Sequence, residues 1–368
     1  QHFKIITESC GTLNGTTNTD RTNYFETAPS NQLEKMMWLE ADRMGFLLDS
    51  VTQKKFEIQR ATVKNERGQR YDNAPYGLVN EKIWEALYPQ GHPYSWTTIG
   101  YIEDLNRVDV NDLKRFYMRW YGPNNAVLTV SGDVDTYVVL LLAQKYFGKI
   151  AKGPEVKDQI VPTFSLSSFR YISYEDNVKF PMLNISFPTS KARTKDDAAL
   201  DVLAQVLSGS QGSPLYKAFI ESKKAVSASS FQNSRELTGQ FQFVIRANAN
   251  SGLSDIEKDL TTALDEWEKK GVTDDDLTKF RAQYQSQLYN QLSTVQGKGA
   301  TLASNFTLGK NANEIVAKRR GQCAWRRPVA ATSRLSGKAN FRSKHDTFVM
   351  DSKNRAGCAA NAARCNFQ

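Results

Sequence analysis

The chain offers few side chains that could do chemistry. Its 368 residues include three histidines and four cysteines, and the stretch before residue 316 holds only His2, His92 and Cys10 of these. That stretch has no HExxH or HxxEH metal-binding pair, no GxSxG nucleophile motif, and no P-loop or GxGxxG phosphate loop. The three later cysteines show no zinc-ribbon or CxxC spacing and predict no disulfide framework. Residue types alone therefore indicate a globular protein without an identifiable nucleophile or metal centre.

The positive charge of the chain is confined to its C-terminal tail. Residues 316–368 carry 12 Lys and Arg against two acids, whereas the preceding residues carry 36 against 37, so the tail supplies the whole net charge of +9. The tail is poor in large aliphatic residues and has no helical or strand period, which predicts disorder or an out-of-frame sequence. A basic arm that binds nucleic acid or membrane is the alternative. The nearly neutral body gives no electrostatic reason to bind nucleic acid, and no run of 18 apolar residues predicts a transmembrane helix.

The body alternates between predicted strands and amphipathic helices. Two short β segments at 12–18 and 22–27 join around Asp20. Thr52 is the expected N-cap of a long polar helix that reaches about residue 72. The remaining expected helices are 32–49, 110–120, 196–207, 254–270, 273–292 and 301–315, and the remaining expected strands are 126–131, 182–187 and a pair within 227–247. A polar linker at about 152–162 separates the two halves.

One order of elements occurs twice along the body. A hairpin, a helix, a Val-Thr pair and a long polar helix follow one another around Val51 and again around Val272. Chance similarity of pattern is the alternative explanation. The repeat predicts the α+β class, with two tandem homologous domains, each an antiparallel sheet with helices packed on one side. We expect an N-terminally truncated domain at 1–160, a second and incomplete non-catalytic domain at 161–315, and the basic tail at 316–368.

Several segments, taken in order, resemble the M16 family of zinc peptidases, which includes pitrilysin, insulin-degrading enzyme and mitochondrial processing peptidase. The segments are Gly11–Glu26, Trp38–Met44, Phe56–Glu66, Gly91–Tyr94, Trp120–Asn125 and Gly132–Val134. The resemblance runs from residue 1 to about residue 315, and several motifs in the right order are more specific than any single one. It implies the fold of the LuxS/MPP-like metallohydrolases.

The resemblance also implies a zinc site that this chain does not complete. In the family a helix carries HxxEH, in which two histidines bind zinc and the glutamate activates the metal-bound water. That helix should lie upstream of residue 1, so we expect an inactive fragment of a zinc endopeptidase, with no stably bound zinc. The resemblance assigns the third zinc ligand to Glu66 and a supporting position to Gln59, two helical turns earlier. A solvated helix residue is the alternative for Glu66.

The resemblance assigns substrate binding to one strand, formed by Asn14, Gly15, Thr16, Thr17 and Asn18. A strand edge binds extended or unfolded peptide through backbone hydrogen bonds with little regard to its sequence, and an ordinary hairpin edge is the alternative. The intact enzyme is expected to hydrolyse unfolded peptides between its two homologous domains. A catalytically silent M16-type binding or assembly subunit is the alternative function, and a nucleic-acid-binding protein acting through the tail is less favoured. Bacterial relatives imply a periplasmic or exported location.

Overall fold

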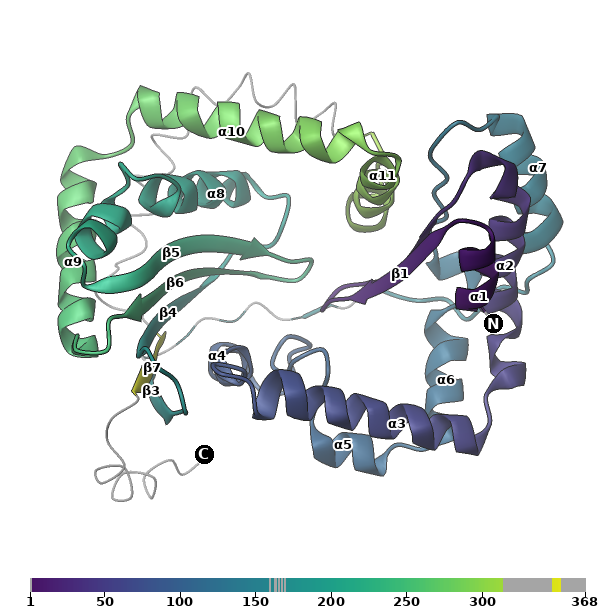
Figure 1. Ribbon diagram of the computed structural model, residues 1–368, viewed down its shortest axis with the longest axis horizontal. Coiled ribbons are helices and arrows are strands. Elements are labelled where there is room, and N and C mark those ends of the chain that lie inside the picture. The colour runs from purple at the N-terminus through teal and green to yellow at the C-terminus, as the bar shows by residue number, and fades with distance from the viewer. Residues whose placement is uncertain are drawn as a thin grey trace. The chain divides into compact units, whose positions relative to one another are not determined.

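The computed structural model describes residues 2–158, 160–161, 164, 166, 168, 170–313 and 346–351. The predictions for the basic tail therefore lie outside the described residues, apart from the strand at Asp346–Asp351. Two compact units divide the chain. One takes its residues from the ranges 1–67, 98–160 and 284–324, and the other from 68–97, 161–283 and 325–368. Figure 1 labels the elements of both.

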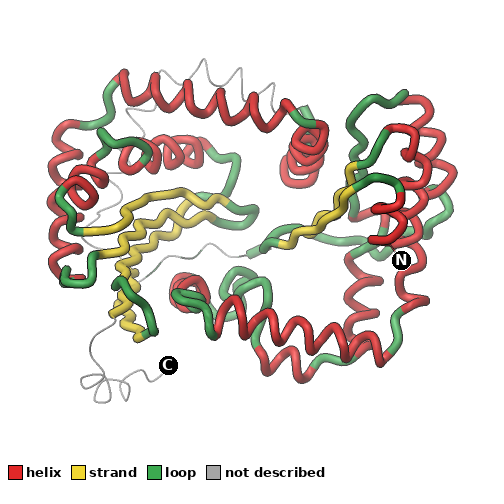
Figure 2. Tube along the Cα trace, viewed as in Figure 1, coloured by secondary structure: helices red, strands yellow, loops and turns green. Residues whose placement is uncertain are grey.

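The first unit is a two-stranded hairpin accompanied by helices, as Figure 2 shows in yellow and red. Its strands are β1 (Thr12–Thr17) and β2 (Thr22–Thr27). Its α-helices are α1 (His2–Glu8), α2 (Leu33–Phe46), α3 (Gln53–Arg67), α5 (Ile102–Arg107), α6 (Val110–Trp120), α7 (Thr136–Phe147) and α11 (Val295–Gly309). Short 3-10 turns occupy Ser30–Gln32, Leu47–Ser50 and Pro123–Asn125.

Local capping explains where several of these helices begin. The Thr52 hydroxyl accepts the Lys55 N–H at 3.3 Å ahead of α3, as expected for an N-cap. Asp109 and Asp112 form a reciprocal capping box that starts α6 at the predicted residue. The predicted long polar helix ends earlier than expected, because α3 gives way at Gly68 to a π-helical turn over Gly68–Asp72.

The second unit contains a five-stranded sheet with the order β3-β7-β4-β6-β5. Its strands are β3 (Arg170–Glu175), β4 (Met182–Thr189), β5 (Ala225–Ser234), β6 (Gly239–Ala247) and β7 (Asp346–Asp351). The β7–β4, β4–β6 and β6–β5 pairs are antiparallel, and β3 pairs with β7 in parallel. Its helices are α4 (Val79–Leu87), α8 (Lys195–Ser208), the π-helical turn Tyr216–Glu221, α9 (Leu253–Lys270) and the first half of α10 (Asp274–Ser293).

Strand alternation gives this sheet two different faces. Odd-numbered residues of β4 and β6, such as Ile185 and Phe243, form an apolar core with α8 and α9 (Figure 1). Even-numbered residues of the same strands, such as Ser186 and Gln240, are buried on the opposite face, where α4 packs against Met182. The α+β class with antiparallel strands and packed helices, predicted from sequence, is confirmed.

One predicted strand does not form. Residues 126–131 alternate in hydrophobicity as a strand would, yet they carry no strand assignment. A strand needs a hydrogen-bonded neighbour, and in the described part of the chain none pairs with this segment. Val127 and Leu128 consequently remain 37% and 49% exposed.

Candidate functional site

The β1–β2 hairpin presents one open strand edge. β1 pairs antiparallel with β2, and among the described residues it pairs with no other strand. The Asn18 N–H donates to the Arg21 carbonyl at 3.0 Å and closes the hairpin. Hydrogen-bonded and non-hydrogen-bonded pairs alternate along antiparallel strands. The backbone groups of Leu13, Gly15 and Thr17 therefore face away from β2, toward the open edge.

This edge contains the residues that sequence reasoning assigned to peptide binding. Asn14 to Asn18 are all exposed in the structure. The Gly15 N–H donates a hydrogen bond to Oδ1 of the neighbouring Asn14 side chain at 2.8 Å. The Arg21 guanidinium holds the hairpin straight by donating to the Thr16 hydroxyl at 2.5 Å and to Asn23 Oδ1 at 2.9 Å. The edge is thus accessible to a partner strand.

The two residues assigned to the zinc site lie on α3. Glu66 is half-buried near the end of this helix, and Gln59 is exposed two turns earlier. Three ligand-bearing side chains close together are the minimum for a protein zinc site. Among the described residues, Glu66 belongs to no such group. The residues present around Glu66 therefore do not fit a zinc ion, and no step of chemistry follows from that position alone.

A different set of ligand-bearing side chains does converge in this unit. His2 of α1, Glu26 of β2 and Glu40 of α2 each offer one atom, and these atoms lie within 4.8 Å of one another. Each side chain is half-buried. Sequence reasoning missed this cluster because the three residues come from separate elements without motif spacing. Only the packing of the hairpin on α2 brings them together.

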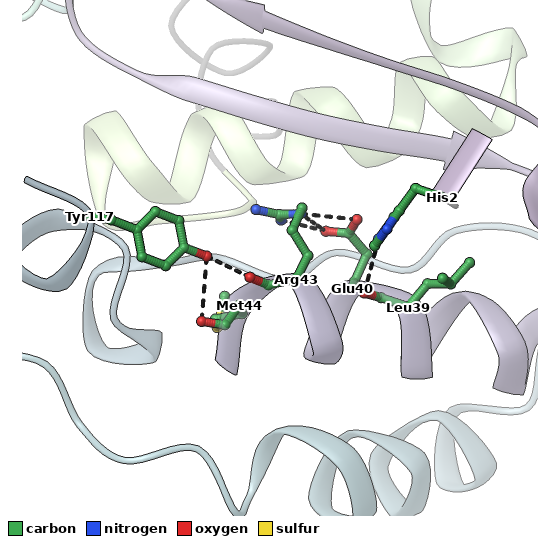
Figure 3. Close-up of polar contacts among 6 residues, drawn as sticks. All are labelled: His2, Leu39, Glu40, Arg43, Met44 and Tyr117. Carbon is green, nitrogen blue, oxygen red and sulfur yellow. Dashed lines mark hydrogen bonds and ion pairs between the residues drawn. The ribbon is translucent and has the colours of Figure 1, made fainter. Parts of the chain in front are cut away.

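An arginine beside the cluster neutralises part of its charge. Figure 3 shows the Arg43 guanidinium directed at Glu40, with Nε 3.1 Å and Nη2 2.5 Å from Glu40 Oε2. The same guanidinium lies 3.8 Å above the Tyr24 ring, a cation–π contact. On the other side, the Tyr117 hydroxyl donates to the Arg43 carbonyl at 2.6 Å. Glu40 of α2 and Tyr24 of β2 therefore hold the Arg43 side chain, while Tyr117 contacts the Arg43 backbone.

Glu26 has a strongly perturbed acidity. Burial, together with the charge of and a hydrogen bond to the neighbouring Glu40, raises its pKa from 4.5 to about 7, although the Arg43 charge lowers it. Its Oε2 atom is buried and has no hydrogen-bond partner among the described residues. At neutral pH the Glu26 carboxyl is therefore partly protonated, and its protonated form can hydrogen-bond to Glu40.

Replacing Glu26 by Gln should make the protein more stable at alkaline pH. The folded-state pKa lies above the unfolded one, so the folded chain binds more protons between 4.5 and about 7, and stability falls as pH rises through this window. Gln imitates the protonated carboxyl and removes this loss. We expect a gain of about 1 kcal/mol above about pH 8, after a discount for solvent screening, and little change near pH 5.

Urea unfolding of wild type and Glu26→Gln across this pH range measures the effect. Glu103→Gln, at an exposed position of α5, is the matched surface control. Parallel pH profiles for wild type and Glu26→Gln would contradict the assignment.

Parts of this chain are similar to known peptidases. Residues 107–284 match the family model described as the peptidase M16 inactive domain. The zinc protease PqqE of Helicobacter pylori is 26% identical over 299 residues, which cover 79% of this chain and 66% of that protein. The chain thus spans about two thirds of the length of this relative.

Two solved structures share the fold. The crystal structure of a protease from Helicobacter pylori has a TM-score of 0.79 at 23% identity, covering 95% of this chain and 84% of that one. The first half of the periplasmic protease PqqL from Escherichia coli has a TM-score of 0.69 at 16% identity, covering 93% of this chain and 75% of that one. The family model covers just under half of this chain, and it and the related zinc protease confirm the similarity to the M16 peptidases, while the solved structures show the shared fold.

Proposed function

We propose that this chain binds extended, unfolded peptide along the open edge of β1, as the substrate-binding part of an M16-type zinc endopeptidase. The observation that carries the proposal is the exposure of Asn14 to Asn18 on a strand whose other side is paired with β2. A peptide strand added at this edge would bond to the outward backbone groups of Leu13, Gly15 and Thr17. Backbone bonding tolerates many peptide sequences, as digestion of unfolded chains requires.

The proposed whole enzyme would bind zinc. The Helicobacter pylori relative is named a zinc protease. Glu66 would contribute one carboxylate to such a metal, and the uncharged Gln59 could support it by a hydrogen bond. Because the described residues around Glu66 do not complete a zinc site, we expect this chain to bind peptide without cleaving it. Chelation of metal should therefore leave peptide binding unchanged.

A catalytically silent binding or assembly subunit is the second candidate. It is favoured by the match of residues 107–284 to the inactive-domain model. The two candidates share peptide binding at β1 and differ in their need for Glu66. We retain 1–160 and 161–315 as the proposed tandem domains and 316–368 as the proposed tail.

No helix in the described residues is both long enough and apolar enough to cross a bilayer. One solved structure of the same fold is a periplasmic protease. We propose an exported location for this chain on that basis. Cell fractionation of the native host, with an antibody against this chain, tests it.

Replacing Gly15 by Pro should weaken peptide binding by about tenfold. Proline removes the N–H that faces the open edge, and proline is tolerated at positions whose N–H points out of a sheet. Gly15→Ala is the matched control, because it adds a Cβ 3.2 Å from the Asn23 carbonyl oxygen but keeps the N–H. The measurement is fluorescence anisotropy of a short, fluorescein-labelled unstructured peptide, with and without EDTA.

Equal affinities of Gly15→Pro and Gly15→Ala would show that the peptide does not pair with β1. Circular dichroism of both variants confirms that the hairpin unit still folds. Binding that disappears with EDTA would instead contradict the metal-independent part of the proposal.

A further inference from the structure

One imidazole and two carboxylates from three elements form a ligand set on the first unit. His2, Glu26 and Glu40 supply atoms within 4.8 Å of one another. Zinc binds His nitrogen and carboxylate oxygen at about 2.0–2.2 Å, so ligand atoms in a tetrahedral site lie about 3.4 Å apart. Side-chain movements of about 1 Å would bring the three ligand atoms to that separation. We propose that His2, Glu26 and Glu40 bind a zinc ion, at a site separate from Glu66 and independent of peptide binding.

A buried atom of Glu26 points to a missing partner. Glu26 Oε2 is shielded from solvent, and no N–H or O–H donor among the described residues reaches it, so the Glu26 carboxyl pairs with Glu40 only when a proton lies between them. A buried polar atom without a partner costs free energy, and native proteins leave few of them. A metal ion bound between Glu26 and its two neighbours would satisfy this oxygen.

The position of His2 suits a metal ligand. Its Nε2 lies 3.2 Å from the Leu39 carbonyl oxygen, and Figure 3 shows this contact beside Glu40. When Nε2–H donates to that carbonyl, the lone pair of Nδ1 remains available for a metal. Metal-binding histidines commonly donate their second ring N–H to a backbone carbonyl, which fixes the tautomer and the ring orientation.

The Arg43 cation beside Glu40 is compatible with a bound metal. Each carboxylate oxygen has two lone pairs, so Glu40 can accept from Arg43 and bind zinc at once. Two carboxylates against one guanidinium leave an excess of negative charge for the ion. Arg43 also lies over Tyr24, which keeps its guanidinium on the side of Glu40 shown in Figure 3.

The site should compete with protons. Carboxylates and imidazole bind zinc in their deprotonated forms, so the affinity for zinc should fall as pH is lowered. The titratable or charged groups around Glu26 are His2 of α1, Glu40 and Arg43 of α2, Tyr24 of β2, and Tyr117 and Tyr121, which face Tyr24 and Arg43. Arg43 stays charged: burial lowers its pKa, but the hydrogen bond and charge of Glu40, with Tyr117 and Tyr24, together raise it by more.

Isothermal titration of the full chain with zinc chloride tests the site. All four cysteines are first replaced by serine, so that thiols cannot bind the metal. We expect one equivalent of zinc at slightly alkaline pH, and a loss of affinity of about tenfold or more in Glu26→Gln and in His2→Gln. Glu66→Gln should bind zinc as tightly as the parent.

Three results would overturn the proposal. The first is the absence of saturable zinc binding by the parent chain. The second is unchanged affinity in Glu26→Gln, which resembles the protonated side chain and should fold. The third is loss of binding in Glu66→Gln, which would place the metal at α3. None of these results bears on peptide binding at β1, so the two proposals fail separately.

Discussion

Replacing Phe243 by Ala should destabilise the protein by about 3–5 kcal/mol. Phe243 lies on β6 with 1% of its surface exposed, in the core between the sheet and helices α8 and α9. Its ring meets Phe241 edge-on at 5.3 Å and Phe187 at 6.3 Å between centroids. Truncation to Ala removes the ring from this packed core and leaves a cavity that the strand and helices can only partly fill. The loss is a large share of the total stability of an ordinary domain.

Urea unfolding followed by circular dichroism measures this loss. Phe231 on the neighbouring strand β5 is the matched control, because 40% of its surface is exposed and Phe231→Ala should cost about 1 kcal/mol. If Phe243→Ala is too unstable to purify, Phe243→Leu should still fold with a smaller loss. Equal effects at 231 and 243 would contradict the placement of the core.

Replacing Arg235 by Ala should cost about 3 kcal/mol, whereas Arg235→Met should cost much less. Arg235 is 6% exposed, and its guanidinium carbon lies 4.2 Å from the centroid of the Tyr94 ring and 5.1 Å from that of Trp84. It also donates to the Tyr88 hydroxyl. Alanine loses these contacts and opens a cavity.

Methionine distinguishes packing from charge at this position. The Nε and Nη1 atoms of Arg235 are buried and have no hydrogen-bond partner among the described residues. Met fills a similar volume without burying these donors, so its effect should stay within about 1.5 kcal/mol in either direction. A loss as large as that of Arg235→Ala would show that the charge itself stabilises the fold.

The same variant has a second, independent readout. The pKa of His92 is lowered by burial and, to a smaller extent, by the positive charge of Arg235. Arg235→Met removes only the second cause, so the His92 pKa should rise part of the way toward its ordinary value. An NMR titration of the histidine ring signals measures this shift.

Sequence patterns predicted the elements whose capping residues or partner strand lie close by in the sequence. Helix α6 matches its expected range because the Asp109 capping box lies beside it in sequence. The β1–β2 hairpin was predicted because two short β segments are joined by a turn around Asp20. Residues 126–131 have the same kind of alternation, but a strand also needs a neighbour, and its own sequence does not specify one.

The two parts of the candidate site differ in the same way: one is local in sequence, and the other depends on tertiary packing. The open edge at Asn14–Asn18 is a contiguous segment, and the resemblance to a peptidase family assigned peptide binding to it, which stays a prediction. The His2, Glu26 and Glu40 set depends on how β2 packs against α2 through Tyr24 and Arg43. Such packing is a tertiary property, and no spacing in the sequence encodes it.

The buried polar face of the β4–β6 pair restricts misfolding. A slip of one residue between these strands would turn Gln240 and Gln242 into the apolar core and Phe241 and Phe243 out of it. In the observed pairing both glutamine amides donate to the Ser186 hydroxyl, at 3.1 and 3.2 Å. After a slip these amides would be buried without partners, at a cost of about 1–3 kcal/mol each. The buried glutamines and Ser186 therefore act mainly by disfavouring the strand pairing that is shifted by one residue.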